Sequence, residues 1–264
     1  MLNVIVCIKQ VPDPNKLDMV KIHPVTKTII REGIPLVINP VDKNAIEEAL
    51  RLREKHGGRV VVLSMGPPQA REACREALAM GADEAILLCD RALAGSDTLA
   101  TAYALAKAIE KIGKFDLVLC GSETVDGSTG QVPPQLAEFL GVPHVTRARK
   151  LEIKDGKALV ESVIEHGYRL VEVELPAVIS VVKEINTPRI VSAFGLVEAA
   201  SKKLEVWTAK DIGADPSMIG LEGSPTAVVD VFKKEFKRMG IVLKGDPEEV
   251  VKQALDKLHE LGVL

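Results

Sequence analysis

The sequence has few aromatic side chains, and its cysteines form no closely spaced pair. Phe, Trp and Tyr make up 3% of the 264 residues, which argues against the aromatic stacking surfaces that bind single-stranded nucleic acid. The four cysteines, Cys7, Cys74, Cys89 and Cys120, include no C-x-x-C pair, so neither a zinc site nor a disulfide framework is predicted. We expect reduced, buried thiols in a cytoplasmic protein.

Strong net charge and long apolar runs are also missing. The formal net charge is −3, so nothing indicates binding to nucleic acid or to an anionic membrane. No run approaches the roughly 18 apolar residues that span a bilayer, and direct membrane insertion is not expected. The apolar start MLNVIVCIKQV lacks the cationic flank and the small-residue cleavage site of a signal peptide. The length of the chain allows a substantial buried core.

Short apolar runs alternate with helical patterns over the first half of the chain. Continuous apolar runs, which are typical of strands covered on both faces, occur at Val4–Ile8, Val60–Ser64, Ala85–Leu88 and Leu117–Cys120. Helical spacing of apolar residues predicts helices over Ala45–Lys55, Gln69–Met80, Thr98–Ile112 and Val132–Leu140. This alternation predicts an α/β fold with a doubly wound, mostly parallel sheet, whose ligand lies beyond the carboxyl ends of the strands.

The pattern changes to antiparallel strands near Val145. The turn sequence Lys154-Asp155-Gly156-Lys157 lies between two β-rich segments and predicts a hairpin over residues 151–163. Residues 168–175 alternate between polar and apolar side chains, and another apolar run follows at 177–182. We expect these strands to extend the same domain.

The remainder of the chain has the composition of an arm. From Thr187 to about Lys244, Gly, Pro, Ser and Lys accumulate without strong periodicity, and an amphipathic helix is expected after Asp246. We predict a nucleotide-binding domain over residues 1–186. Residues 187–264 are expected to form a partner-recognition loop and a C-terminal arm with a terminal helix, which needs another protein to pack against.

Two polar segments precede predicted helices at this edge of the sheet. The side chains of Asn39-Pro40-Val41-Asp42 either cap the helix or present an amide and a carboxylate to ribose or adenine. The segment Gly95-Ser96-Asp97-Thr98, with Thr101, is either a plain capping sequence or a set of ligand contacts.

A third polar segment, Asp126-Gly127-Ser128-Thr129-Gly130-Gln131, follows the strand that ends at Cys120. The glycines allow close approach of the backbone, and Ser128, Thr129 and the helix that begins at Val132 offer donors to a phosphate. A turn followed by a helix cap uses the same residue types. Three such segments at one edge favour an extended dinucleotide as the ligand.

Several ordered motifs resemble a known family. They are Val6–Val11, Asn39-Pro40 with Glu47–Leu52, Met65-Gly66-Pro67, Ala79–Asp83, Asp116–Gly121 with Asp126–Gln131, and Leu175–Val178. Over essentially its whole length the sequence resembles the small (beta) subunit of the electron-transfer flavoproteins, which have an adenine-nucleotide-binding type of sheet. The resemblance implies a heterodimer with a larger alpha subunit that carries FAD. In the non-bifurcating branch the beta subunit binds AMP, without a redox role.

The segment Gly95–Thr101 resembles a different branch, in which a second FAD replaces AMP. That branch implies oxidation of NADH at the beta-subunit flavin. One electron passes to ferredoxin or flavodoxin, and the other passes through the alpha-subunit FAD to a quinone oxidoreductase or an acyl-CoA dehydrogenase. Two other interpretations stay open, namely the AMP-holding subunit and an ATP-binding stress or signalling module.

The candidate cofactor-binding residues combine these segments with the ends of the predicted strands. They are Cys7, Lys9, Asn39, Pro40, Val41, Asp42, Met65, Gly95, Ser96, Asp97, Thr98, Thr101, Cys120, Asp126, Gly127, Ser128, Thr129, Gly130, Gln131 and Val132. Because a carboxylate opposes negative charge on a flavin, we expect Asp97 to cap its helix or to contact the ribityl chain.

The segment 192–203 aligns with the recognition loop of the acyl-CoA-dehydrogenase-linked branch. Ala193 stands at the position of that branch's leucine, and most of its lysines are absent. The resemblance therefore favours a quinone oxidoreductase of the nitrogen-fixation type, with Phe194 and Leu196 as apolar anchors. Such a complex would be cytoplasmic, or peripheral to the membrane through partner subunits.

Overall fold

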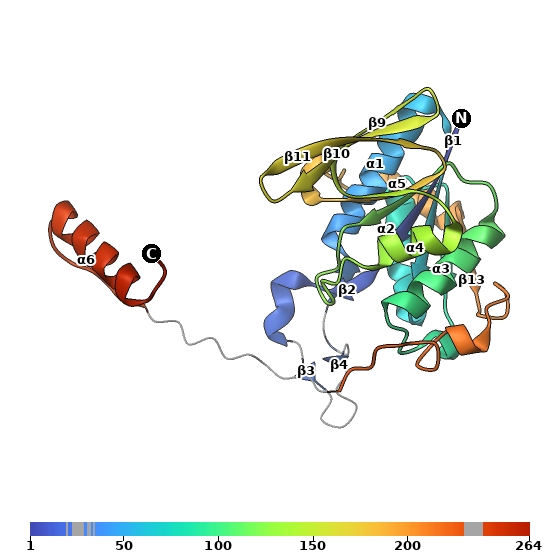
Figure 1. Ribbon diagram of the computed structural model, residues 1–264. Helices are drawn as coiled ribbons and strands as arrows, with labels where there is room; N and C mark the ends of the chain where they lie inside the picture. The colour runs from blue at the N-terminus through green and yellow to red at the C-terminus, as the bar shows by residue number, and fades with distance from the viewer. Residues whose placement is uncertain (20, 23–28, 31–32, 34, 230–239) are drawn as a thin grey trace. The chain divides into compact units, whose positions relative to one another are not determined.

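The computed structural model describes residues 1–19, 21–22, 29–30, 33, 35–229 and 240–264. The chain divides into two compact units, Met1–Val229 and Asp230–Leu264. The helices and strands of both units are labelled in Figure 1.

The first unit is built on a nine-stranded sheet in the order β11-β10-β9-β12-β8-β1-β6-β7-β13. Neighbouring strands are parallel from β9 to β13, whereas β10 is antiparallel to both β9 and β11. The strands are β1 (Leu2–Ile8), β6 (Gly58–Met65), β7 (Glu84–Leu88), β8 (Leu117–Gly121), β9 (His144–Lys154), β10 (Lys157–Ile164), β11 (Gly167–Glu174), β12 (Ala177–Val181) and β13 (Lys203–Trp207). The predicted fold class, a mostly parallel sheet with an antiparallel extension, is confirmed.

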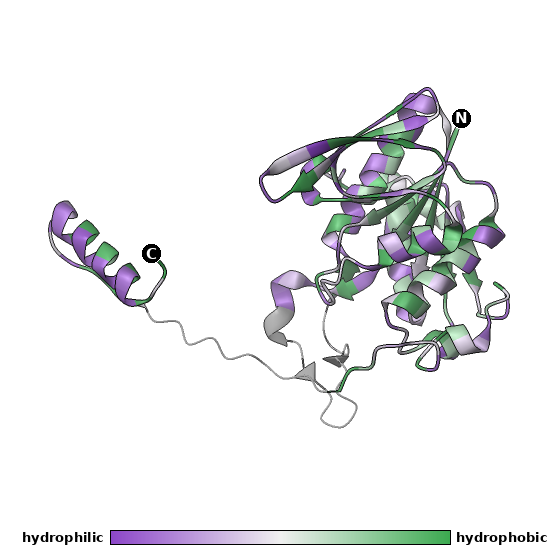
Figure 2. Cartoon of the chain, in the orientation of Figure 1, coloured by the Kyte–Doolittle hydropathy of each residue, from purple (hydrophilic) through white to green (hydrophobic). Residues whose placement is uncertain are grey.

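Helices cover both faces of this sheet. They are α1 (Pro40–His56), α2 (Arg71–Met80), α3 (Thr98–Ile112) and α4 (Val132–Leu140). Successive side chains of a strand point to opposite faces, so Val4 and Val6 pack in one core cluster with α1 and α2, while Ile5 packs in the other with α3 and α4. Hydrophobic residues accordingly concentrate on the central strands and on the inner faces of the helices (Figure 2). Burial of the strands on both sides explains their continuous apolar runs.

The helices begin close to the predicted positions, with one difference. Helices α3 and α4 have the predicted bounds, and the 3-10 helix η2 (Pro68–Ala70) precedes α2. Helix α1 begins at Pro40 and not at Ala45, because proline is favoured in the first turn, where its missing N–H costs no hydrogen bond. The side chain of Asn39, at the N-cap position, makes no capping hydrogen bond.

The predicted hairpin is confirmed. Strands β9 and β10 are joined by Asp155 and Gly156, whose φ angles are 51° and 76°. Two positive φ angles in a two-residue loop match the turn that suits the twist of a hairpin. Two smaller pairs, β2 (Gln10–Pro12) with β5 (Leu36–Ile38) and β3 (Lys21–Ile22) with β4 (Ile29–Ile30), lie between β1 and α1 in the sequence.

Residues 187–229 belong to the first unit, although the sequence predicts an arm from residue 187. Helix α5 (Ala193–Ser201) packs against α2, and β13 pairs with β7 at the edge of the sheet. The 3-10 helices η4 (Lys183–Ile185) and η5 (Pro216–Met218) lie on either side of them in the sequence, and η1 (Pro14–Met19) follows β2. The predicted recognition loop is thus a helix. These elements are too short to give a clear period in the sequence.

The second unit contains the predicted terminal helix, α6 (Pro247–Glu260). Its N-cap residue, Asp246, accepts hydrogen bonds from the backbone N–H groups of Glu248 and Glu249. Val251 and Leu255 on this helix are exposed. Among the described residues, no helix is both long and apolar enough to cross a membrane.

Candidate functional site

A cavity of about 1160 Å³ lies at the carboxyl ends of the central strands. Strands β1, β6, β7 and β8 contribute Cys7, Met65, Leu88 and Cys120 to its lining. Ligand pockets commonly measure about 300–1,000 Å³, so this cavity has room for an extended ligand. Its position is the one predicted for a doubly wound sheet.

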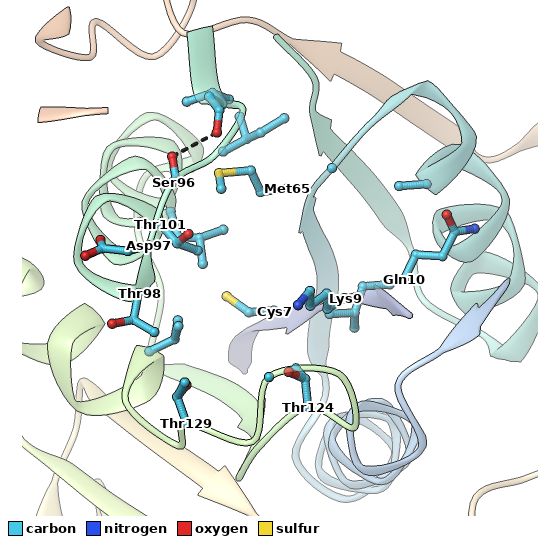
Figure 3. Close-up of a pocket in the computed structure, with 18 of the residues that line it drawn as sticks. Cys7, Lys9, Gln10, Met65, Ser96, Asp97, Thr98, Thr101, Thr124 and Thr129 are labelled. Atoms are coloured by element: carbon cyan, nitrogen blue, oxygen red, sulfur yellow. Dashed lines mark hydrogen bonds between the residues drawn. The ribbon is translucent and has the colours of Figure 1, made fainter. Parts of the chain in front are cut away.

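Most of the predicted cofactor-binding residues line this cavity. They are Cys7, Lys9, Asp42, Met65, Gly95, Ser96, Asp97, Thr98, Thr101, Cys120, Gly127, Thr129, Gly130, Gln131 and Val132. In Figure 3, Ser96, Asp97, Thr98 and Thr101 lie on one side, with Cys7 and Met65 beside them. The predicted residues outside the lining are Asn39, Pro40, Val41, Asp126 and Ser128.

A group of buried contacts, the buried loop cluster, joins the loop after β1 to the loop after β8. It comprises Lys9, Asn39, Asp42, Gly121 and Val125. The carboxylate of Asp42 accepts hydrogen bonds from Lys9 N (2.8 Å), Asn39 Nδ2 (3.0 Å) and Gly121 N (3.2 Å). The exposed fraction of Asp42 is only 4%. One carboxylate at the start of α1 therefore fixes two loops of the cavity.

The amide of Asn39 has a structural role in this cluster. Its Nδ2 donates to Glu123 O (2.9 Å) as well as to Asp42, and its Oδ1 accepts from Val125 N (3.2 Å). The residue is fully buried. Asn39 thus neither caps α1 nor faces the cavity, because a buried amide that shapes the neighbouring loop satisfies its own polar groups.

Burial dominates the electrostatics of Asp42. Removal from water raises the pKa of its carboxyl from 3.8 to about 7, although the hydrogen bonds from Asn39, Lys9 and Gly121 act in the opposite direction. The close approach requires glycine at position 121, because a Cβ there would lie 2.2 Å from Asp42 Oδ1. The cluster has no space for a side chain at that position.

An ion pair connects the loop after β1 to the third polar segment. Lys9 Nζ lies 2.8 Å from both carboxylate oxygens of Asp126, whose side chain is 9% exposed. Lys9 itself lines the cavity. Asp126 therefore acts on the cavity through Lys9, which explains why a predicted site residue lies outside the lining.

The third polar segment offers fewer donors than the sequence suggested. The N and Oγ of Ser128, whose φ is 48°, both donate to Thr124 O, so this hydroxyl stabilises the turn. Helix α4 begins Val132-Pro133-Pro134, and proline has no N–H. The first turn of α4 therefore has an N–H group at Val132 and none at the two prolines. The next N–H group, that of Gln135, donates a hydrogen bond to Gln131 O. An anion at this place would therefore be held by the loop's own N–H groups and by Thr129.

A second group of contacts, the exposed loop cluster, surrounds the start of α3. It comprises Ser96, Asp97, Thr98, Ser224 and Thr226. Asp97 Oδ1 accepts from Leu99 N (2.9 Å) and Ala100 N (3.0 Å), so the prediction that Asp97 caps the helix is confirmed. Its Oδ2 accepts from Thr226 N (3.1 Å) and Oγ1 (2.8 Å).

The pKa of Asp97 shifts in the direction opposite to that of Asp42. Burial opposes ionisation, but the hydrogen bonds from Ala100, Thr226 and Leu99 outweigh it and lower the pKa of Asp97. Thr98 Oγ1 donates to Gln131 Oε1 (3.0 Å) and thereby links this cluster to the third polar segment. The carboxylate is therefore ionised and held at the mouth of the cavity.

Several lining residues were not predicted from the sequence. The loop after β7 supplies Cys89, Asp90, Arg91, Leu93 and Ala94, the loop after β8 supplies Ser122, Glu123 and Thr124, and the later chain supplies Thr208, Thr226 and Val228. Loops that follow parallel strands are expected at a site of this kind, so the loops after β7 and β8 were accessible to the same rule. No signal in the sequence indicates the contact of Thr226.

The cysteines are free, and two of them lie on the cavity floor. Cys7 and Cys120 are register partners on adjacent strands and are 8% and 5% exposed. Contact with the Cys7 thiol and burial raise the pKa of Cys120 well above its usual value. The Cys120 thiol is therefore neutral, and the sulfur atoms of both residues are polarisable contacts for a ligand.

Comparisons with known proteins point to one family. A model of the electron transfer flavoprotein domain matches residues 26–212. An electron transfer flavoprotein subunit beta from Thermoanaerobacterium thermosaccharolyticum is 51% identical over 264 residues, 100% of both chains. The caffeyl-CoA reductase-Etf complex subunit CarD of Acetobacterium woodii is 45% identical over 265 residues, also 100% of both chains.

Protein FixA of Azorhizobium caulinodans is similar as well. It is 46% identical over 239 residues, which are 88% of this chain and 84% of FixA. The resemblance seen in the sequence is thereby confirmed: the chain belongs to the electron transfer flavoprotein family, as one of its beta subunits.

Proposed function

We propose that this beta subunit holds a complete FAD in its cavity and, with its alpha partner, oxidises NADH and bifurcates the electrons. One observation supports the proposal above all. The same cavity is lined by the loop at Gly127–Val132, which AMP alone would use, and by Gly95–Thr101 at the start of α3. A mononucleotide leaves the second of these without a ligand to contact, whereas a dinucleotide spans both.

The lining fits a flavin dinucleotide. The volume of about 1160 Å³ exceeds the usual range for ligand pockets. Among the described lining residues there is no Phe, Tyr or Trp, so the flat rings would rest on aliphatic groups and on the sulfur atoms of Cys7, Met65 and Cys120. Sulfur is polarisable and packs well against aromatic rings.

Each loop has a role in this proposal. The backbone of Gly127 and Gly130 and the hydroxyl of Thr129 would hold the pyrophosphate, and Lys9 contributes positive charge nearby. The hydroxyls of Thr98 and Thr101 would contact the polar edge of the flavin ring. The bound flavin would supply the chemistry, which is acceptance of an electron pair and its release to two different acceptors.

The proposed partners follow from the family and from the sequence. Membership of the beta subunits implies an alpha subunit as the partner in a heterodimer. Ferredoxin or flavodoxin would take one electron and a quinone oxidoreductase the other, because most of the lysines of the acyl-CoA-dehydrogenase-linked loop are absent. Phe194 and Leu196 on α5 are 84% and 61% exposed, as apolar docking anchors must be, and Ala193 begins the helix. The complex would act in the cytoplasm, or at a membrane through its partner subunits.

A coupled assay with both acceptors tests the proposal. The purified heterodimer is supplied with NADH, with ferredoxin alone, with a quinone oxidoreductase alone, and with both. We expect rapid reduction of ferredoxin only when both acceptors are present, since bifurcation couples the two transfers. A heterodimer that does not oxidise NADH under any of these conditions contradicts the proposal.

The alternative function is that of a simple electron carrier whose beta subunit holds AMP. The Gly127–Val132 loop would hold AMP as well as the corresponding part of FAD, and in that case Gly95–Thr101 would be a helix cap with no ligand beside it. An ATP-binding stress or signalling module is not supported, because the full-length relatives are electron-transfer subunits.

A further inference from the structure

Residues 219–228, here called the strap, run beside the start of α3. The strap leaves the core at Ile219, which is 4% exposed and packs in the cluster that contains α3. Gly220 N then donates to Ser96 Oγ (3.0 Å), and Asp97 N donates to Ser224 Oγ (2.8 Å). The loop before α3 and the strap, more than 100 residues apart in the sequence, are therefore joined by several polar contacts.

Glycines on both sides allow the two segments to approach closely. Gly220 has φ 61°, and a Cβ there would lie 2.4 Å from Ala92 O. Gly95 has φ 80°, and a Cβ there would lie 2.6 Å from Leu221 Cδ2. Positive φ combined with such short distances excludes other side chains without rearrangement. The contact between the strap and this loop is thus built into the backbone.

Asp97 joins the strap to the helix. Its Oδ1 caps α3 through Leu99 N and Ala100 N, and its Oδ2 accepts both the N–H and the hydroxyl of Thr226. The carboxylate therefore divides its two oxygens between a fixed element and the strap. Asparagine at this position could still cap α3 through its amide oxygen. Its N–H₂ group would then face the N–H and the hydroxyl of Thr226, which are donors as well.

The end of the strap forms part of the cavity wall. Thr226 and Val228 both line the cavity that Asp97 and Thr98 also line. Val228 is 74% exposed, and the hydrogen bonds of Thr226 are exposed to solvent. A segment that makes few buried contacts opens at little cost, even while the core stays folded. The end of the strap beyond Ser224 can thus detach and leave the sheet intact.

We propose that the strap closes the cavity over the bound nucleotide and that Asp97 is the positioning residue that keeps it closed. The inference rests on the proposed function, since it takes the flavin end of FAD as the ligand part beneath the strap. Release of the nucleotide then requires that Thr226 leave Asp97.

The test uses the full chain purified with its alpha partner and loaded with FAD. Two readouts are measured for wild type, Asp97→Asn and Thr226→Val. One is hydrogen exchange of the strap amides, and the other is the rate at which FAD leaves the cavity of the beta subunit. Loss of one net hydrogen bond of about 1 kcal/mol corresponds to a change of about fivefold. We expect FAD release about five to ten times faster in Asp97→Asn and about three to five times faster in Thr226→Val, with faster strap exchange in both.

The combined variant and a matched control sharpen the test. Asp97→Asn with Thr226→Val should release FAD no faster than Asp97→Asn alone, because both substitutions break the same contact. Asp246→Asn changes the corresponding cap residue of α6 and should leave both readouts unchanged.

The outcomes separate the strap from the proposed function. Faster strap exchange in Asp97→Asn with unchanged FAD release would show that the strap is no lid, and unchanged exchange would show that Asp97 does not hold it. A wild-type complex that carries AMP in this cavity overturns the assignment of FAD. The release of AMP is then measured in the same variants, and the same differences in rate would support closure of the cavity by the strap. A cavity that retains no nucleotide overturns both.

Discussion

The two polar clusters at the mouth of the cavity differ in burial, and this difference separates structural residues from adjustable ones. In the buried loop cluster, Asn39 and Asp42 satisfy one another and the backbone of the loop after β8. In the exposed loop cluster, Asp97 holds the strap through contacts that solvent reaches. Both clusters consist of residue types that are common in ligand-binding loops. The buried loop cluster, called the frame below, is however held in place by its own hydrogen bonds.

On the proposed function, the two clusters would hold opposite ends of a long ligand. The frame would position one end, because Asn39 and Asp42 are buried and their hydrogen bonds are costly to break. The wall formed by the strap would open to let the other end enter. Substitutions in the frame are therefore expected to affect folding, whereas substitutions in the exposed loop cluster are expected to affect retention of the ligand.

The largest expected effect is that of Gly121→Ala in the frame. The new Cβ would lie 2.2 Å from Asp42 Oδ1 and 3.2 Å from Asp42 N. We expect a loss of about 3 kcal/mol or more in the free energy of unfolding, since a packed site has no room to adjust. Urea unfolding measures it, with Gly240→Ala, whose Cβ would meet nothing within 4 Å, as the control. If the variant were about as stable as wild type, Asp42 and the backbone around it would be able to move and make room for the new Cβ.

The second effect is a difference in pH dependence. The pKa of Asp42 rises on folding from 3.8 to about 7, so the folded chain binds more protons between these values and the free energy of unfolding falls as pH rises through this window. The expected contribution is on the order of 2–4 kcal/mol. Asp42→Asn should abolish this component.

Asp97 should show the opposite behaviour. Its pKa is lowered on folding from 3.8, so the stability that it contributes is complete above the unfolded value and is lost only as pH falls below it. Unfolding curves of wild type, Asp42→Asn and Asp97→Asn between pH 3 and pH 8 measure both effects. If Asp42→Asn retained the wild-type slope between pH 4 and pH 7, Asp42 would not be the buried acid of the frame.

The smallest expected effect on stability is that of Thr98→Val. It removes the exposed hydrogen bond from Thr98 Oγ1 to Gln131 Oε1, which contributes less than about 1 kcal/mol. Retention of FAD should nevertheless weaken by about threefold, because the hydroxyl lines the cavity at the proposed flavin end. Equilibrium dialysis against FAD checks the prediction. A marked loss of stability with normal FAD retention would contradict the prediction, because it would show that Thr98 acts in folding and not in retention of the ligand.

Much of the fold could be predicted from the sequence because its signals are local. Burial on both faces of the sheet imposes the continuous apolar runs at Val4–Ile8 and Leu117–Cys120, and packing of a helix on it imposes the helical spacing at Thr98–Ile112. The end of the first unit could not be predicted. Strand β13 is stabilised by pairing with β7, and α5 by packing on α2, and such contacts leave no pattern in short segments.

The site was predictable in location but not in every role. The rule that ligands lie beyond the carboxyl ends of parallel strands led to the edge at which the cavity lies, and most of the predicted residues line that cavity. Burial decides which polar group faces the ligand, and sequence does not show burial: Asn39 turned inward, Pro133 and Pro134 removed donors from α4, and Thr226 came from more than 120 residues away.

A count of the nucleotides in the purified heterodimer tests the central claim most directly. Nucleotides released by denaturation are separated and quantified for each complex of one alpha and one beta subunit. A cavity that spans the frame and the exposed loop cluster predicts two FAD and no AMP. One FAD with one AMP would contradict the claim, and the segment Gly95–Thr101 would then be a cap for α3 and an anchor for the strap without a ligand beside it.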